Sequence, residues 1–204
     1  MTPAHRATIA FARGGLFAIA ALLASGRIGG LARDLPSLAA AFGALQLALP
    51  LVGFALAGAV GGASLGTGRR ATLGFAGGCF LAGAVLSAAW PHLSGLTGHE
   101  SLAAVLSFAA AAWAVAFGIA GAIGGACLAR GRTWHVGAGF AGGGAVGAVL
   151  LVMPVLLAPA GLHAWPPTVQ LAVTVTSSAA GLLAPFAIGG AAAGRAVDEG
   201  DGQA

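Results

Sequence analysis

Long segments without a charged residue constrain this chain more than any other feature. Residues 71–89, 102–129, 136–158 and 168–194 contain no Arg, Lys, Asp or Glu. Each segment is close to or longer than the about 20 residues that a helix needs to cross a bilayer. Because a spanning backbone must satisfy its own hydrogen bonds, these segments predict an all-α integral membrane protein. A transmembrane β-barrel would show ten-residue segments in which apolar and polar residues alternate, and the sequence has none.

The sequence also repeats itself. Residues 54–69 (FALAGAVGGASLGTGR) match residues 117–132 (FGIAGAIGGACLARGR) at ten of sixteen positions. The segment RATLGFAGG at 70–78 resembles RATIAFARGG at 6–15, where Arg13 reads as one inserted residue, and VGAGFAGGG at 136–144. These matches indicate that one pair of helices was duplicated twice, with a period near 64 residues.

The repeat predicts six transmembrane helices arranged as three tandem hairpins in a single membrane domain over 1–204. The repeat units are 6–69, 70–132 and 133–195, and the acidic segment 196–204 is expected to be a disordered tail. Two helices per unit preserve orientation, so the copies are parallel repeats around an axis along the membrane normal. Both a pseudo-threefold bundle and a two-plus-one packing fit this pattern. The helices are expected at 8–25, 37–66, 71–90, 101–129, 136–158 and 168–195.

Arginine placement predicts the orientation. With six helices, one side of the membrane receives seven arginines and the other only Arg27 and Arg33. The positive-inside rule then places both termini in the cytoplasm of a bacterial-type inner membrane. The basic start and short apolar stretch of the first segment also fit a cleavable signal peptide. Its match to residues 70–86 favours a retained helix.

Glycines four residues apart recur in the second helix of each unit. Such a spacing places glycines on one helix face, where two backbones can approach closely. Lipid provides no hydrophobic force that joins helices, so this contact is expected to hold the bundle together. Generic small residues in a membrane helix are the alternative interpretation. The candidate helix-packing residues are Gly58, Gly62, Gly121, Gly125, Gly190 and Gly194.

No catalytic, cofactor or metal motif is recognisable, so we expect a protein that is not an enzyme and has no cofactor. The sequence lacks HExxH, a phosphate-binding GxxxxGK[ST] and CxxC, and no acidic residue lies inside a predicted helix. The missing carboxylate argues against an ion-coupled carrier. The arginines lie at the ends of apolar segments without interleaved aromatics, so we expect lipid and not nucleic acid as their partner.

Two groups of polar residues are the remaining functional candidates. Thr174, Ser177 and Ser178 share one face of the last helix, and Gln46 occupies the position of Thr174 in the first unit. They are predicted either to line a cavity or to bond locally within and between helices. On the other side of the membrane, the candidates for pH sensing are His92, His99, Glu100 and His163. An aromatic belt with incidental histidines is the alternative there.

The second unit, RRATLGFAGGCFLAGAVLSAAWPHL followed by LAAVLSFAAAAWAVAFGIAGAIGGACLARGR, resembles the repeat of the six-helix membrane proteins of bacterial acid resistance, the HdeD-like family. Trp90–Pro91 and the arginines Arg130 and Arg132 carry the resemblance, which implies a stress-related inner-membrane protein without catalysis. We therefore expect a structural or stress-protective protein that acts as a homo-oligomer or with a membrane-protein partner. The alternative is a small-solute channel or facilitator.

Overall fold

A computed structural model describes residues 2–96, 102–128, 133–157 and 165–201, and these residues are almost entirely helical. All six helices are long and apolar enough to cross a membrane, so the chain is built as a multi-pass membrane protein. A short 3-10 helix, η1 (Pro36–Leu38), joins the first two. The helices are α1 (Pro3–Asp34), α2 (Ala39–Ser64), α3 (Arg69–Leu96), α4 (Leu102–Ala126), α5 (Thr133–Leu157) and α6 (Pro167–Asp201).

Three segments are helical where the sequence predicted loops or disorder. Residues 26–34 continue α1, and residues 91–96 continue α3. The predicted disordered tail is also wrong for residues 196–201, which form the last turns of α6, with Ala196 and Val197 packed on the core. Residues 202–204 lie outside the described residues. The predicted boundaries ended α1 and α6 too early, because charged side chains are tolerated where a helix leaves the bilayer.

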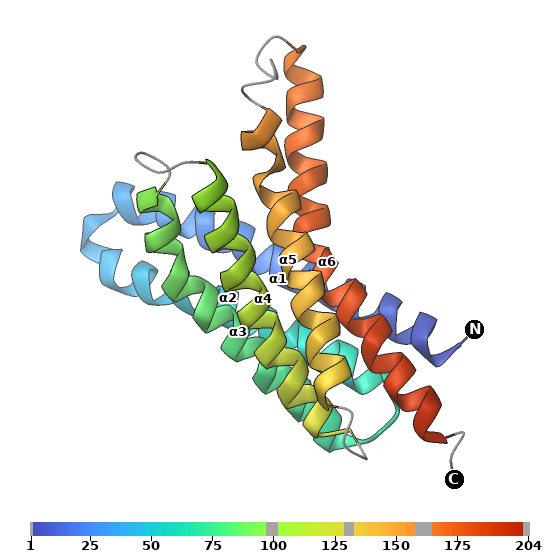
Figure 1. Ribbon diagram of the computed structural model, residues 1–204. Coiled ribbons are helices and arrows are strands. Elements are labelled where there is room, and N and C mark those ends of the chain that lie inside the picture. The colour runs from blue at the N-terminus through green and yellow to red at the C-terminus, as the bar shows by residue number, and fades with distance from the viewer. Residues whose placement is uncertain (1, 97–101, 129–132, 158–164, 202–204) are drawn as a thin grey trace.

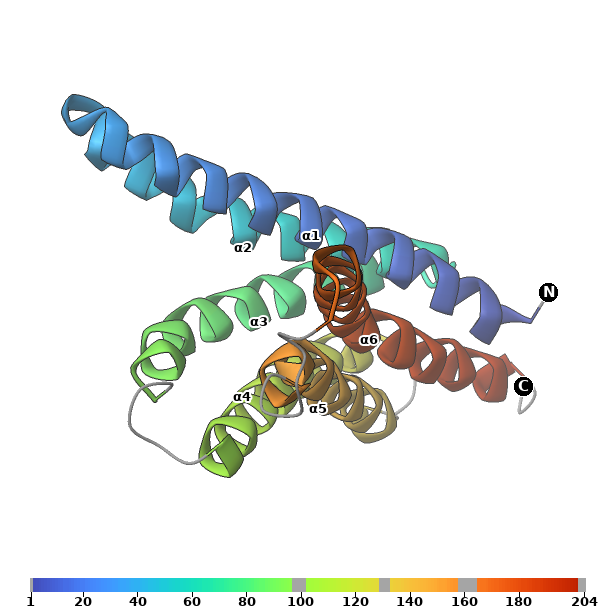
Figure 2. The same ribbon diagram turned by 90° about the horizontal axis from the view of Figure 1, so that it is seen from above.

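The six helices pack as a closed ring in chain order, in which α6 returns to contact α1. Both termini lie at one end of the bundle, called here the terminal side. The helix ends that are consecutive within each hairpin lie at the other end, called the loop side (Figure 1). The three hairpins meet near the terminal side and spread apart toward the loop side, as Figures 1 and 2 both show. Most buried side chains accordingly belong to the terminal half of the helices.

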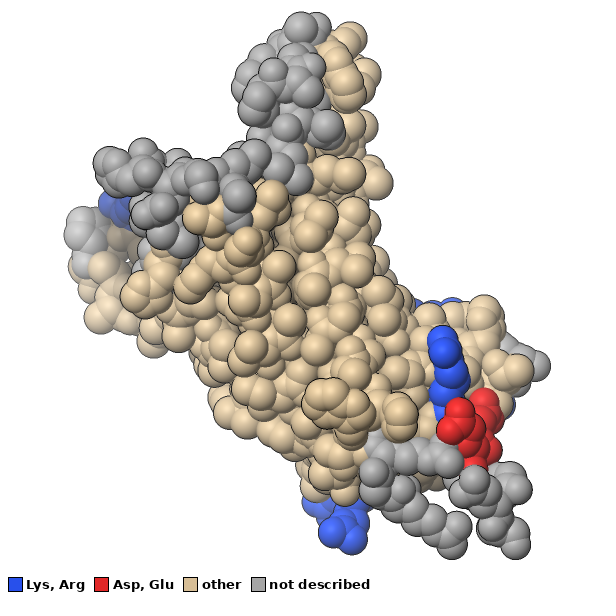
Figure 3. Space-filling view, viewed as in Figure 1, with Lys and Arg blue, Asp and Glu red and all other residues tan. Residues whose placement is uncertain are grey.

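In the view of Figure 3, the side chains of Arg, Asp and Glu lie at the ends of the bundle, and none lies on the described surface between them. Large exposed hydrophobic side chains include Leu23, Leu47, Leu73 and Leu171, each at least 59% exposed. In water such a surface would be a liability, whereas lipid chains cover it without penalty. The exposed apolar residues are therefore a consequence of the membrane environment.

The first helices of the three hairpins bury the same face. Counted from Phe11, Phe75 and Phe140, the positions −4, +3, +4 and +7 are buried in α1, α3 and α5 alike. This equivalence also corrects the interpretation of Arg13 as an insertion. Gly14 packs on Ala57 as Gly78 packs on Ala120, so Arg13 takes the place of Gly77 with no extra residue.

Six phenylalanines form the centre of the terminal half, in two layers. Phe11, Phe75 and Phe140 contact one another with ring centroids 5.0 to 5.8 Å apart. The second layer, formed by Phe54, Phe117 and Phe186, has centroids 5.5 to 6.0 Å apart. All six rings are at most 3% exposed. Each hairpin contributes one ring to each layer, so the two layers join all three hairpins.

Phe186 departs from the sequence alignment of the repeats. The alignment pairs Gly189 and Gly190 with Gly124 and Gly125, which would set Phe186 opposite Gly121 and not opposite Phe117. The ring contacts instead place Phe186 with Phe54 and Phe117. A shift of four residues is about one helical turn and leaves the same face inward, so α6 can contribute its ring one turn later.

Candidate functional site

The six candidate packing glycines lie where one hairpin meets the next. Gly58 and Gly62 of α2 face α3, Gly121 and Gly125 of α4 face α5, and Gly190 and Gly194 of α6 face α1. These contacts between hairpins are called here the seams. A methyl group on a seam glycine would come too close to the neighbouring helix. A Cβ on Gly62 would lie 2.9 Å from the Ala71 backbone oxygen, and one on Gly121 would lie 2.7 Å from that of Val136. One on Gly190 would lie 3.0 Å from the Ala7 oxygen.

A second set of glycines lies within the hairpins, and sequence reasoning did not separate it from the first. A Cβ on Gly14 would lie 2.5 Å from the Ala57 oxygen, and one on Gly78 would lie 2.6 Å from that of Ala120. A Cβ on Gly143, the corresponding position of the third hairpin, would lie 2.8 Å from the Cα of Pro185. The phenylalanine rings of the first layer lie in the same way over glycines of their own hairpins: Gly61, Gly124 and Gly189.

Gln46 and the polar face of α6 belong to hairpins that spread apart on the loop side (Figure 1). The side chain of Gln46 lies over Gly29 of α1, where a Cβ would approach its Nε2 to 2.7 Å. Its backbone oxygen accepts a hydrogen bond of 2.8 Å from Ser25 Oγ, which joins α1 to α2. This bond uses the backbone of Gln46, so the predicted bonding of its side chain stays a prediction.

On α6, the hydroxyl of Ser177 donates to the backbone oxygen of Thr174 at 3.2 Å, within its own helix. Ser177 is buried, Ser178 is half-buried and Thr174 is exposed. The two pockets described below are lined by other residues.

Of the four candidates for pH sensing, only His92 falls among the described residues. It was predicted in a loop but lies inside α3, with an exposed side chain. His99, Glu100 and His163 lie outside the described residues. Within the described part of the chain, no three His, Cys, Asp or Glu side chains gather as a metal site would require. Cys79 and Cys127 are free thiols.

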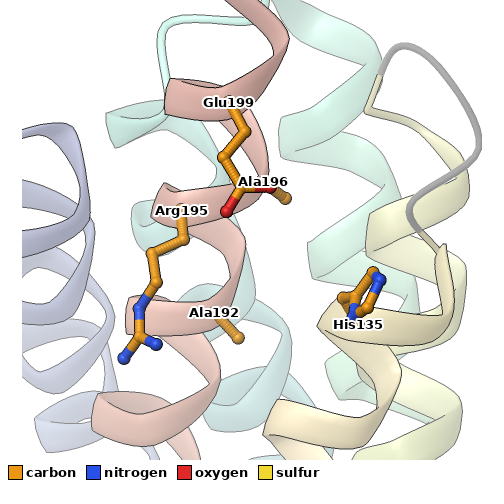
Figure 4. A pocket seen from close by; sticks show the side chains of 5 residues that line it. All are labelled: His135, Ala192, Arg195, Ala196 and Glu199. Carbon is orange, nitrogen blue, oxygen red and sulfur yellow. The ribbon is translucent and has the colours of Figure 1, made fainter.

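Two surface pockets lie at the terminal side. One, of about 240 Å³, is lined by His135 of α5 and by Ala192, Arg195, Ala196 and Glu199 of α6 (Figure 4). Here a carboxylate accompanies the basic side chains. Arg195 and Glu199 are one helical turn apart on α6, so a positive and a negative side chain both line this pocket.

The other pocket, of about 630 Å³, is a groove between α1 and α2 and is called here the arginine groove. One wall follows a single face of α1, with Arg6 and Arg13 at its ends and Ile9 and Ala10 between them. The opposite wall consists of Val60, Ala63 and Ser64 of α2.

The sequence analysis treated Arg13 as an inserted residue of the repeat and did not connect it to a groove. The signal was the seven-residue spacing from Arg6, which places both arginines on one helix face. The helix α2 that completes the groove could only come from the structure. Comparisons with models of protein families, with curated proteins and with solved structures find no match.

Proposed function

We propose that this chain is a non-enzymatic protein of a bacterial-type inner membrane, structural or stress-protective in role, with both termini in the cytoplasm. The observation that carries the proposal is the double layer of phenylalanines, because six packed rings occupy the centre where the three hairpins meet. A conducting pore needs a continuous polar or water-filled path, and this centre is apolar and filled. The stress-protective part of the proposal rests on the sequence resemblance described above.

Glycine-mediated packing is the proposed basis of the assembly. The seam glycines allow backbone contact between hairpins, and the glycines within hairpins allow the same between paired helices. In a bilayer, close van der Waals contact of this kind replaces the hydrophobic force that drives soluble folding. Such a bundle is suited to forming a scaffold for a second copy or for a membrane-protein partner.

The first prediction tests the proposed lack of transport. Purified protein reconstituted in liposomes is expected to leave the permeability to water, glycerol and protons at the level of empty liposomes. Stopped-flow light scattering measures the first two and an enclosed pH dye measures the third. A flux that rises with the protein-to-lipid ratio would remove the proposal and favour the small-solute channel or facilitator.

The second prediction tests the orientation. Because five described arginines, Arg6, Arg13, Arg69, Arg70 and Arg195, lie at the terminal side, a reporter fused after Ala204 should stay in the cytoplasm. A green fluorescent protein fusion is expected to fluoresce, and an alkaline phosphatase fusion is expected to be inactive. As a matched control, the same reporters inserted after Leu35, at the turn between α1 and α2, should give the opposite result. An active phosphatase at the C-terminus would contradict the proposed orientation.

A further inference from the structure

We infer that the arginine groove binds the headgroup of one anionic phospholipid from the leaflet at the terminal side of the bundle. The inference goes beyond the proposed structural role, since it assigns a ligand class to a particular surface. It rests on the shape of the groove, on its charge and on its position along the membrane normal.

The groove combines two cationic groups with apolar walls. Arg6 and Arg13 line it together with Ile9, Ala10 and the 36%-exposed Val60, and no acidic residue is among its lining residues. The Ser64 hydroxyl already donates to the Gly61 carbonyl at 2.6 Å, so the two guanidinium groups carry the charge recognition. A phosphodiester attached to acyl chains complements both the two arginines and the apolar walls.

The depth of the two arginines suits a lipid better than a soluble anion. Their backbones are seven residues apart, or about 10 Å along the helix axis. Long helical side chains lean toward the helix N-terminus, which for α1 is the terminal side, so Arg13 extends toward the level of Arg6. In the proposed complex one phosphate lies between the two guanidinium groups, while its acyl chains run along Ile9 and Val60 into the hydrocarbon.

The corresponding positions of the other hairpins lack this combination. Arg70 of α3 is the counterpart of Arg6, but Gly77 stands where α1 has Arg13. In α5 the counterparts are His135 and Gly142, and the pocket beside His135 contains Glu199. A Cβ on Gly77 or Gly142 would meet no atom within 4 Å. The position of Arg13 therefore faces outward, and packing of the bundle does not require an arginine there.

The test is native mass spectrometry of delipidated protein titrated with phosphatidylglycerol or phosphatidylcholine. We expect wild-type protein to retain one phosphatidylglycerol with an apparent affinity about 30-fold above that for phosphatidylcholine, the gain expected of two arginines near a lipid surface. Arg6→Gln and Arg13→Gln should each remove most of this preference. The matched control Arg70→Gln, at the counterpart of Arg6, should keep it. Each variant is first required to match the wild-type circular dichroism and elution volume.

Three results would overturn the inference. The first is a wild-type protein with no preference between the two lipids. The second is an Arg70→Gln variant that loses as much preference as Arg13→Gln, which would mean diffuse attraction and not a site. The third is displacement of phosphatidylglycerol by an equimolar amount of inorganic phosphate, which would identify a site for soluble anions. Retention of the lipid in excess inorganic phosphate supports the lipid.

Discussion

Replacing Phe75 by alanine is expected to destabilise the bundle by about 2–4 kcal/mol, which is lower than the about 3–5 kcal/mol that such a change costs in a water-soluble protein. The Phe75 side chain is fully buried, with its ring centroid 5.0 Å from that of Phe11 and 5.8 Å from that of Phe140. Its ring also fills the space over Gly124. Alanine would leave a cavity where three hairpins meet, and the surrounding backbones cannot close it without breaking the glycine contacts.

The expected loss is smaller than in a water-soluble protein for a physical reason. In water, removing a phenylalanine loses both its transfer free energy and its packing contacts. In a bilayer the unfolded helices are already in an apolar solvent, so mainly the packing contacts are lost. Reversible unfolding in mixed micelles of a mild detergent and dodecyl sulfate, followed by circular dichroism, measures the free energy of unfolding.

Phe80, on the same helix as Phe75, supplies the control. Its side chain is 41% exposed toward the membrane, so Phe80→Ala should change the free energy of unfolding by less than about 1 kcal/mol. If Phe75→Ala were no more destabilising than Phe80→Ala, the phenylalanine layers would not be the structural centre. A double-mutant cycle with Phe11→Ala should also give a coupling of about 0.5–1.5 kcal/mol between the two rings.

The fold class and the number of helices could be predicted from the sequence, because charge-free segments of sufficient length have few alternatives in a chain of this composition. The equal spacing of Phe11, Phe75 and Phe140, 64 and 65 residues apart, was also visible. The contact among these three rings could not be predicted, because equal spacing shows which residues are equivalent but not how the three copies pack. The duplication itself remains a prediction, supported by the shared burial pattern of α1, α3 and α5.

The functional candidates illustrate a different limit. Polar residues such as Gln46 and Ser177 attract notice because they are rare in an apolar chain, yet their contacts in the structure are local. The arginine groove is formed by residues 6–13 and 60–64, which are far apart in the sequence, so neither wall alone predicts the groove. Helix ends were also misjudged, because Ala196 and Val197 pack on the core despite the acidic residues that follow.

Replacing Gly78 by leucine is expected to destabilise the bundle by at least about 3 kcal/mol, the upper end of the usual range for overpacking. A Cβ at this position would lie 2.6 Å from the backbone oxygen and 2.9 Å from the Cα of Ala120. Both atoms belong to the backbone of α4, which cannot rotate away as a side chain can. The paired helices α3 and α4 would have to separate, and they would lose contact along their length.

The adjacent Gly77 provides a matched control. It lies on the same helix turn with nothing within 4 Å of its Cβ position, so Gly77→Leu faces lipid and should change the free energy of unfolding by at most about 0.5 kcal/mol. The same micelle unfolding assay compares the two variants. The pair Gly142 and Gly143 tests whether the hairpins are equivalent, because a Cβ on Gly143 would lie 2.8 Å from the Cα of Pro185 while one on Gly142 meets nothing. If leucine were as destabilising at Gly77 as at Gly78, or at Gly142 as at Gly143, close backbone contact would not be what holds these hairpins closed.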